Sequence, residues 1–292
     1  MSPLLKIIVA FFVVAVVAPC QAQQVNKTDE TKADEAATKK AVTAHWLGVA
    51  DSLAKDYVFT PVDAVDAVNS PFTLQEKAIF RHTQTVRGDD IGAVYVWKEA
   101  SGRPAVIGVI FAWSQGRNRW VMNEFHSLHK NGIAMDLPGK RSWTTEQPGL
   151  QWQPFLKADP PDSSTLKQKL QAKALSRRVS ANATDPTKAR WELRLVPTAI
   201  YEYSIPEEGV SYGGVFSLCQ GTDTELLVIV EARQTEGKAE WHYAFAPFTD
   251  YQLAVSIDDE RVWESPEGTV SENGKPHYWD FLEQRPKPGF EP

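Results

Sequence analysis

The sequence predicts an α+β fold made of two tandem halves, each with one helix packed on an antiparallel meander of strands. Two segments with helical spacing of apolar residues each precede a series of β-branched and aromatic segments. Turns that contain Gly, Pro or Asn separate the extended segments, as hairpins require. Shifting the chain by 121 residues also superposes the two series, which places Gly92 on Gly213. We therefore expect helix, meander, helix, meander as the order of the fold.

Composition fixes the broad class of protein. The chain has 292 residues, of which 42% are hydrophobic, 11% aromatic and 23% charged, which excludes disordered, collagen-like and coiled-coil proteins. This length is sufficient for one large core or two small ones. The net charge of −6 argues against the basic surface that nucleic-acid binding requires, so we expect no nucleic-acid partner.

Residues 1–22 have the layout of a secretory signal peptide. Lys6 precedes the apolar run 7–18, and the small residues Cys20 and Ala22 stand at positions −3 and −1 of a cut after Ala22. This predicts a secreted or periplasmic protein, with lipidation of Cys20 or an uncleaved anchor as alternatives. No later run approaches the length of a membrane span, so we expect no transmembrane segment in the mature chain.

Cleavage leaves Cys219 as the single cysteine of the mature chain. One cysteine cannot form an intramolecular disulfide, so none is predicted. Because Cys219 follows the apolar residues 215–218 and has no adjacent basic residue, we interpret it as a small buried hydrophobic residue.

The predicted first half covers residues 41–156 and follows a polar tether, residues 23–40, that has no apolar face. It opens with a helix of about 16 residues that ends before Pro61, because apolar residues recur at helical spacing from position 42. The apolar positions of this helix are Val42, Trp46, Val49, Leu53 and Val58. Three β-rich segments follow, at 93–97, 105–113 and 120–128, and form the first meander.

The predicted second half covers residues 164–284. A proline-rich linker, residues 157–163, precedes it, and a tail, residues 285–292, follows it. Its helix is expected to bury Leu166, Leu170, Ala174 and Val179, with Asp162 or Ser163 as the cap. The basic residues of the helix are expected to face solvent: Lys167, Lys169, Lys173, Arg177 and Arg178. Its strands are expected at 191–196, 199–203, 214–218, 225–232, 240–246 and 252–257.

The 121-residue shift is interpreted as an internal duplication. It aligns Gly116 with Gly237 and Trp120 with Trp241, in addition to the pair of glycines above. Matching turn glycines and tryptophans carry more weight than matching valines, which any two meanders share. A convergent strand pattern is the alternative.

Five stretches of the chain together resemble an uncharacterised family of secreted proteins of the planctomycete type. The stretches are 92–97 (GAVYVW), 102–104 (GRP), 120–128 (WVMNEFHSL), 192–195 (ELRL) and 221–227 (GTDTELL). The resemblance covers residues 70–265. It implies export and a shared fold, and it implies no activity, cofactor or catalytic residue.

Glu124 and His126 are the strongest candidates for chemistry. Two residues apart on a strand, they point to the same face, where a carboxylate and an imidazole can bind a metal or act as general acid and base. Structural hydrogen bonding and plain solvent exposure are the alternatives. The chain has no phosphate-binding glycine loop, nucleophile elbow or zinc-protease motif, so no cofactor is predicted beyond a divalent metal at this pair.

Four tryptophans are candidate ligand-binding residues because they lie in polar, turn-rich sequence: Trp143, Trp152, Trp263 and Trp279. Exposed aromatic side chains of this kind suit sugar stacking or a protein interface.

These features lead to a predicted role as an exported, non-catalytic binding or structural component of the cell envelope, with an envelope protein or a polysaccharide as partner. One alternative is a metal-assisted or acid/base hydrolase that uses Glu124 and His126. A second alternative is a carbohydrate-binding module that uses the four tryptophans.

Overall fold

The computed structural model describes residues 22–62, 70–84, 90–115, 118–137, 141–265 and 277–285. Residues up to Val42 and residues from Thr43 onward are two separate compact units. One continuous helix, α1 (Ala22–Asp56), runs through residues 23–40. Residues 1–21 of the predicted signal peptide and the tail beyond Arg285 lie outside the described residues.

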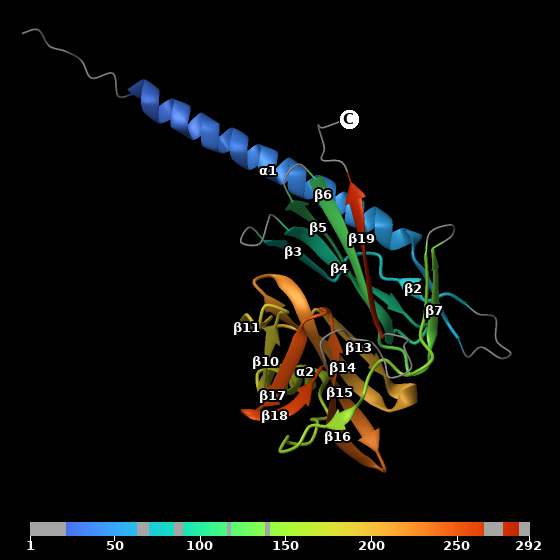
Figure 1. The fold of residues 1–292 in the computed structure, drawn as a ribbon. Coiled ribbons are helices and arrows are strands. Elements are labelled where there is room, and N and C mark those ends of the chain that lie inside the picture. The colour runs from blue at the N-terminus through green and yellow to red at the C-terminus, as the bar shows by residue number, and fades with distance from the viewer. Residues whose placement is uncertain are drawn as a thin grey trace, which may run out of the picture. The chain divides into compact units, whose positions relative to one another are not determined.

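The first large sheet is an antiparallel meander completed by a strand from far along the chain. Its order is β19-β6-β5-β4-β2, with β3 paired to β4. β19 runs beside β6 and places Tyr278 opposite His126 (Figure 1). The strands are β2 (Thr73–Leu74), β3 (Phe80–Gln84), β4 (Asp90–Lys98), β5 (Pro104–Gln115), β6 (Asn118–Ser127) and β19 (Tyr278–Arg285).

The second large sheet has the order β12-β14-β15-β16-β9, with β13 paired to β14. A 3-10 turn, η1 (Pro206–Glu208), connects β13 to β14, and Gly209 ends it in the left-handed region at φ 74°. The strands are β9 (Gln153–Pro154), β12 (Arg194–Leu195), β13 (Tyr201–Ile205), β14 (Val210–Gln220), β15 (Asp223–Thr235) and β16 (Lys238–Pro247).

Two small antiparallel sheets and a second helix, α2 (Thr165–Ser176), complete the fold. The sheet β1-β7-β8 contains β1 (Val58–Pro61), β7 (Ile133–Leu137) and β8 (Arg141–Thr144). The sheet β11-β10-β17-β18 contains β10 (Val179–Thr184), β11 (Arg190–Glu192), β17 (Gln252–Ile257) and β18 (Glu260–Glu264).

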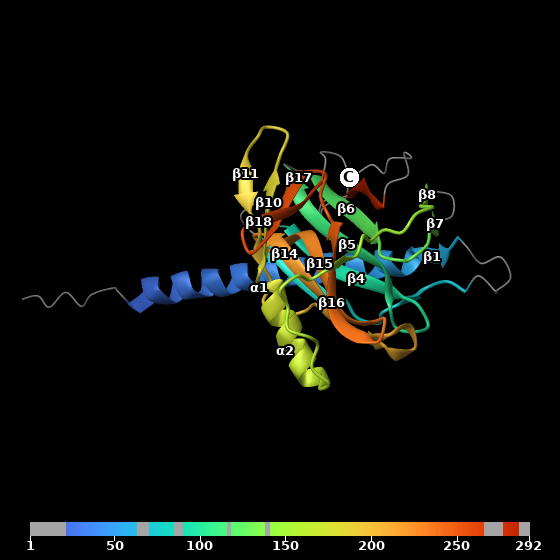
Figure 2. The same ribbon diagram turned by 90° about the horizontal axis from the view of Figure 1, so that it is seen from below.

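Within residues 43–292 the two large sheets share a buried apolar core. Val94 and Val109 of the first sheet and Val215 and Ile229 of the second belong to one cluster of fully buried side chains. The other face of the second sheet packs on α2 and on β10 and β17, again through buried apolar residues. The end of α1 covers the other face of the first sheet, where Asp51 of the helix accepts a hydrogen bond from the Tyr95 hydroxyl of β4 at 2.8 Å. The layers are visible in Figures 1 and 2.

The first pairs of strands in the two large sheets have equivalent registers. Phe80 lies opposite Val94, and adding 121 to both numbers gives the observed pair Tyr201 and Val215. A Cβ on Gly92 would lie 2.8 Å from the His82 ring, and one on Gly213 would lie 2.3 Å from the Tyr203 ring. Each glycine therefore gives room to a ring on the neighbouring strand.

The predicted α+β class is wrong, because the chain is mainly β. Most of the described residues lie in strands, and this part of the chain contains two α-helices and one 3-10 turn. Segments for which no strand was predicted also form short strands, such as β7, β8 and β10, and Val179, expected on the second helix, is the first residue of β10. Runs of four to six residues carry too little periodicity to be recognised as strands in one sequence, which explains the error.

The second predicted helix is present, but it buries the face opposite to the predicted one. Its buried residues are Gln168, Ala172, Leu175 and Ser176, whereas Leu166 and Leu170 are exposed. The N-cap residue is Ser164, which makes no capping hydrogen bond with its side chain. In the first helix, Val58 was expected on the apolar stripe, but α1 ends at Asp56 and Val58 is an exposed residue of β1.

The two large sheets do not follow the predicted halves 41–156 and 164–284. β9, at residues 153–154, pairs with β16 of the second sheet, and β19 pairs with β6 of the first sheet. Each large sheet thus includes a strand from the other half. Local patterns in a sequence cannot show such an exchange, because it depends on contacts between distant segments.

Candidate functional site

A cavity of about 470 Å³ lies between one end of the first sheet and the strands β16 and β18. Its described lining residues come from both large sheets and from β18. They include His126, His277, Tyr278, Tyr243, Phe245 and Trp263. Its volume falls in the range of small-molecule sites.

His126 is one of the buried residues that line this cavity. Its Nδ1 lies 2.8 Å from the Ser127 carbonyl oxygen. A carbonyl only accepts, so Nδ1 carries the proton and donates it. Burial, with a smaller effect from His277, lowers the pKa of His126 to about 3. The imidazole is therefore neutral near pH 7, and its Nε2 is left as an acceptor.

His277 and Tyr278 extend this polar wall. Burial lowers the pKa of His277, so this imidazole is also neutral near pH 7, and its Nδ1 has no hydrogen-bond partner among the described residues. The Tyr278 hydroxyl donates to Glu124 Oε1 at 3.0 Å. Burial raises the pKa of Glu124 well above its usual value of 4.5, and the carboxylates of Asp223 and Glu225 raise it further. This side of the cavity is therefore polar but carries little charge.

The opposite wall is aromatic. The rings of Tyr243 and Phe245 have centroids 5.1 Å apart, and Phe245 and Trp263 have centroids 5.7 Å apart. Ser265 lies beside them, and its Oγ accepts a hydrogen bond from the Leu253 N–H at 2.9 Å. None of the described lining residues is Asp, Glu, Lys or Arg. The site suits an uncharged molecule with an apolar ring and a polar edge.

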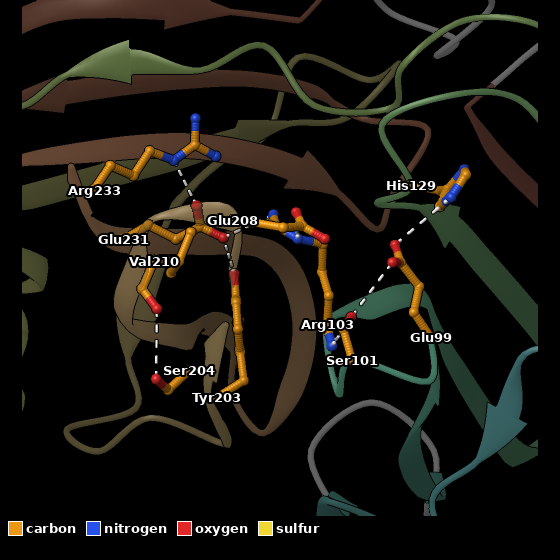
Figure 3. A network of polar contacts seen from close by, with 10 residues as sticks. All are labelled: Glu99, Ser101, Arg103, His129, Tyr203, Ser204, Glu208, Val210, Glu231 and Arg233. Carbon is orange, nitrogen blue, oxygen red and sulfur yellow. Dashed lines mark hydrogen bonds and ion pairs between the residues drawn. The ribbon is translucent and has the colours of Figure 1, made fainter. Parts of the chain in front are cut away.

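A second polar cluster joins the two large sheets without lining this cavity. Glu231 of β15 is fully buried, and its Oε1 lies 3.0 Å from Nη1 of Arg103, a residue of the β4–β5 connection. Arg233 Nε donates to its second oxygen, and the Tyr203 hydroxyl donates to the first at 2.5 Å. Figure 3 shows these side chains converging on the carboxylate. A buried carboxylate satisfied on both oxygens anchors the two sheets to each other.

The predicted pair Glu124 and His126 does lie on one face of β6, but that face is turned to the second sheet rather than to solvent. The two side chains are 8% and 2% exposed. No group of three His, Cys, Asp or Glu side chains suited to a metal occurs among the described residues. The proposed divalent metal stays a prediction.

The four candidate tryptophans occupy different environments. Trp263 lines the cavity. Trp143 and Trp279 stack on each other with centroids 6.0 Å apart, and Trp143 is buried. Trp152 is covered by the guanidinium of Arg233, whose Cζ lies 3.7 Å from the ring centroid. They do not form one open row.

Sequence reasoning missed Glu231 and its partners. The available signal was a single carboxylate within the apolar run 226–232 of a predicted strand, since an acidic residue in a buried strand needs a cation or a hydrogen-bond donor. The partners Arg103 and Tyr203 lie in other strands and connections, so no local spacing pointed to them. Cys219, by contrast, is free and buried in the structure.

Comparison with known proteins gives one partial relative. No family model matches the chain, and no solved structure matches it significantly. A protein of Solidesulfovibrio magneticus named "Probable transcriptional regulatory protein" is 31% identical over 113 residues, which is 39% of this chain and 46% of that protein. The chain thus matches about half the length of this curated relative.

This relative corrects the predicted function. It is named as a regulator, whereas the sequence predicted an exported binding or structural component of the cell envelope, with a hydrolase and a carbohydrate-binding module as alternatives. We do not retain these three functions. No helix in the described part of the chain is long and apolar enough to cross a membrane. Residues 1–21 of the predicted signal peptide lie outside the described residues, so cleavage after Ala22 stays a prediction.

Proposed function

We propose that this protein is a ligand-responsive regulatory protein that binds a small, uncharged, ring-containing molecule in the cavity between β6 and β16. The observation that carries this proposal is the pairing of an aromatic wall with neutral imidazoles around one cavity. The name of the partial relative supports the regulatory class. The ligand class comes from the cavity alone.

The chemistry of the walls defines that ligand. A flat ring gains dispersion and apolar burial against Trp263 and Phe245. A polar N–H or O–H on its edge donates to His126 Nε2, which has no proton of its own to offer. A charged molecule would lose its hydration without an opposite charge among the described lining residues.

The proposal also includes regulation without direct binding to nucleic acid. The chain carries a net charge of −6. Its basic segment around α2 is partly neutralised, because Lys167 pairs with Asp162 at 3.1 Å and Lys169 pairs with Glu202 at 2.6 Å. A phosphate backbone is bound mainly through unpaired cations, so this face is poorly suited to it.

Ligand titrations test the proposal. We would add adenine, uracil and nicotinamide separately to the full chain and follow tryptophan fluorescence and the melting temperature, with citrate as a charged comparison. The expected result is quenching and a higher melting temperature with at least one of the three rings, since a ligand that binds only the folded state raises stability. Citrate should have no effect.

Two matched variants locate the binding. Val262→Trp fills the cavity from its exposed rim, whereas Val58→Trp makes the same change at an exposed position of β1, away from the cavity. Binding should be lost in the first variant and kept in the second. Equal effects of the two variants, or no response to any ring, would contradict the proposed site. In the source organism, transcript levels should change with Val262→Trp and not with Val58→Trp.

A further inference from the structure

Helix α2 has an apolar face that no other described residue of the chain covers. Leu166 is 69% exposed and Leu170, one turn later, is 59% exposed. Both are large apolar side chains at helical spacing i and i+4, so they lie next to each other on the same face. Figure 2 shows α2 at the periphery of the second sheet. We call the side of α2 that carries Leu166, Leu170, Lys173 and Arg177 the leucine face.

The orientation of α2 is fixed by a buried amide. Gln168 is buried, and its Nε2 donates to the Asp162 carbonyl oxygen at 2.6 Å and to Ser211 Oγ at 3.0 Å. Ala172 and Leu175 complete the buried side against the second sheet. Rotating the helix to bury the two leucines would expose these contacts and break both hydrogen bonds. The helix is therefore held with its leucines outward.

Two cations continue the leucine face. Lys173 and Arg177 follow Leu170 at spacings of three and seven residues, which places them along the same side of the helix. Arg177 is exposed and stands at the C-cap position. The face thus changes from apolar to basic along its length, in a chain whose net charge is −6.

We propose that the leucine face of α2 docks an amphipathic, acidic helix of a partner protein. Apolar side chains of that helix cover Leu166 and Leu170, and its carboxylates pair with Lys173 and Arg177. The inference does not depend on the cavity, because α2 contributes no residue to the described lining.

Acidic groups beside the face favour a narrow partner over an anionic membrane. Lys167 and Lys169 flank the leucine face on its two sides, and they pair with Asp162 and Glu202. A flat anionic surface would meet these carboxylates as well as the cations. A single helix lies along the stripe and meets only the leucines and the cations behind them.

A designed peptide tests the docking surface. The probe is a fluorescein-labelled helical peptide with Leu at i, i+3, i+4 and i+7 and Glu on both flanks, titrated with the full chain by fluorescence anisotropy. The expected result is saturable binding that weakens at least tenfold in Leu166→Glu/Leu170→Glu. The matched control Val58→Glu/Val62→Glu, which makes the same changes at two exposed valines elsewhere, should bind as the unmodified chain does.

Charge reversal distinguishes this docking from nonspecific hydrophobic binding. Lys173→Glu/Arg177→Glu should weaken the acidic peptide about tenfold and improve binding of a peptide with Lys in place of Glu. Circular dichroism checks that each variant is folded. Absence of peptide binding, or equal binding by the leucine and valine variants, would overturn the proposal. Loss of binding to phosphatidylglycerol vesicles in the leucine variant, without an effect on the peptide, would assign the face to a membrane instead.

Discussion

Glu124 and Glu231 are two buried carboxyl groups, one in each large sheet, and each accepts a hydrogen bond from a tyrosine. Glu231 also has two arginines beside it. Glu124 has the carboxylates of Asp223 and Glu225 nearby, and burial together with these charges raises its pKa. The same motif is therefore an ion-paired anchor in one place and a weakly charged group in the other. The neighbouring charges, not the tyrosine, decide which.

The largest loss of unfolding free energy should come from removing the Glu231 side chain. Glu231→Ala leaves Arg103 and Arg233 without their shared carboxylate in a region where Glu231 itself is fully buried. Breaking a buried ion pair from one side costs about 3–5 kcal/mol of unfolding free energy, and we expect the lower end of this range because Arg103 keeps Glu208 as a partner at 3.2 Å. Urea denaturation measures it. A loss below about 1 kcal/mol would show that the cluster does not anchor the sheets.

Loss of the tyrosine that pairs with Glu231 should lower the unfolding free energy more than loss of the tyrosine that pairs with Glu124. Tyr203→Phe removes a donor to an ion-paired carboxylate and should cost about 2 kcal/mol, because hydrogen bonds to charged groups are the stronger ones. Tyr278→Phe removes a donor to a carboxyl that favours its protonated form and should cost about 1 kcal/mol. Denaturation of both variants under one set of conditions gives the ranking, and a reversed order would contradict the assigned charge states.

His126, two residues after Glu124, should make the stability of the fold sensitive to acid. Burial lowers the pKa of His126 from 6.5 to about 3, so the folded state keeps the ring neutral while the unfolded state takes up a proton below pH 6.5. Stability is therefore complete above pH 6.5 and falls as the pH drops, by at most about 1.4 kcal/mol per pH unit.

His126→Gln removes that titration. The fall in unfolding free energy between pH 7.0 and pH 5.5 should be smaller by about 1 kcal/mol in this variant than in the unmodified chain. His82, whose pKa burial lowers to about 4, titrates in the same direction and remains in both proteins, so only the difference between their slopes is informative. An equal dependence of the unfolding free energy on pH in the two proteins would mean that a charged group pairs with His126.

The smallest change is expected for Glu124→Gln, which replaces a protonated carboxyl by an amide of the same shape. Near pH 5 the unfolding free energy should change by less than about 1 kcal/mol. Because the folded pKa is raised, the carboxyl of the unmodified chain destabilises the fold increasingly as the pH rises above 4.5, and the variant should become relatively more stable. Urea denaturation at pH 5 and pH 8 checks the sign.

Part of this organisation could be predicted from sequence. The long strands β4, β5 and β6 coincide with the segments rich in β-branched and aromatic residues, because such runs are long enough for their pattern to be read. Glu124 and His126 share a face for the same reason, since alternation along a strand is local.

What could not be predicted depends on distant contacts. Tyr278 meets Glu124 across 154 positions of the chain, and Arg103 meets Glu231 across 128. The face of α2 was predicted wrongly because its sequence places Leu on one side and Gln168 on the other, and Gln168 is buried only through Asp162 and Ser211. No periodicity in the helix itself carries that information.

Strand β19 has a consequence for biosynthesis. During translation β6 leaves the ribosome about 150 residues before its partner strand, as the pairing of Asp280 with Glu124 shows. Until then, one side of β6 presents unpaired amide and carbonyl groups, which other chains can add to as a further strand. The nascent protein therefore passes through a stage in which this edge of β6 is open to pairing with other chains, and a chain shortened before Tyr278 would stay in that stage.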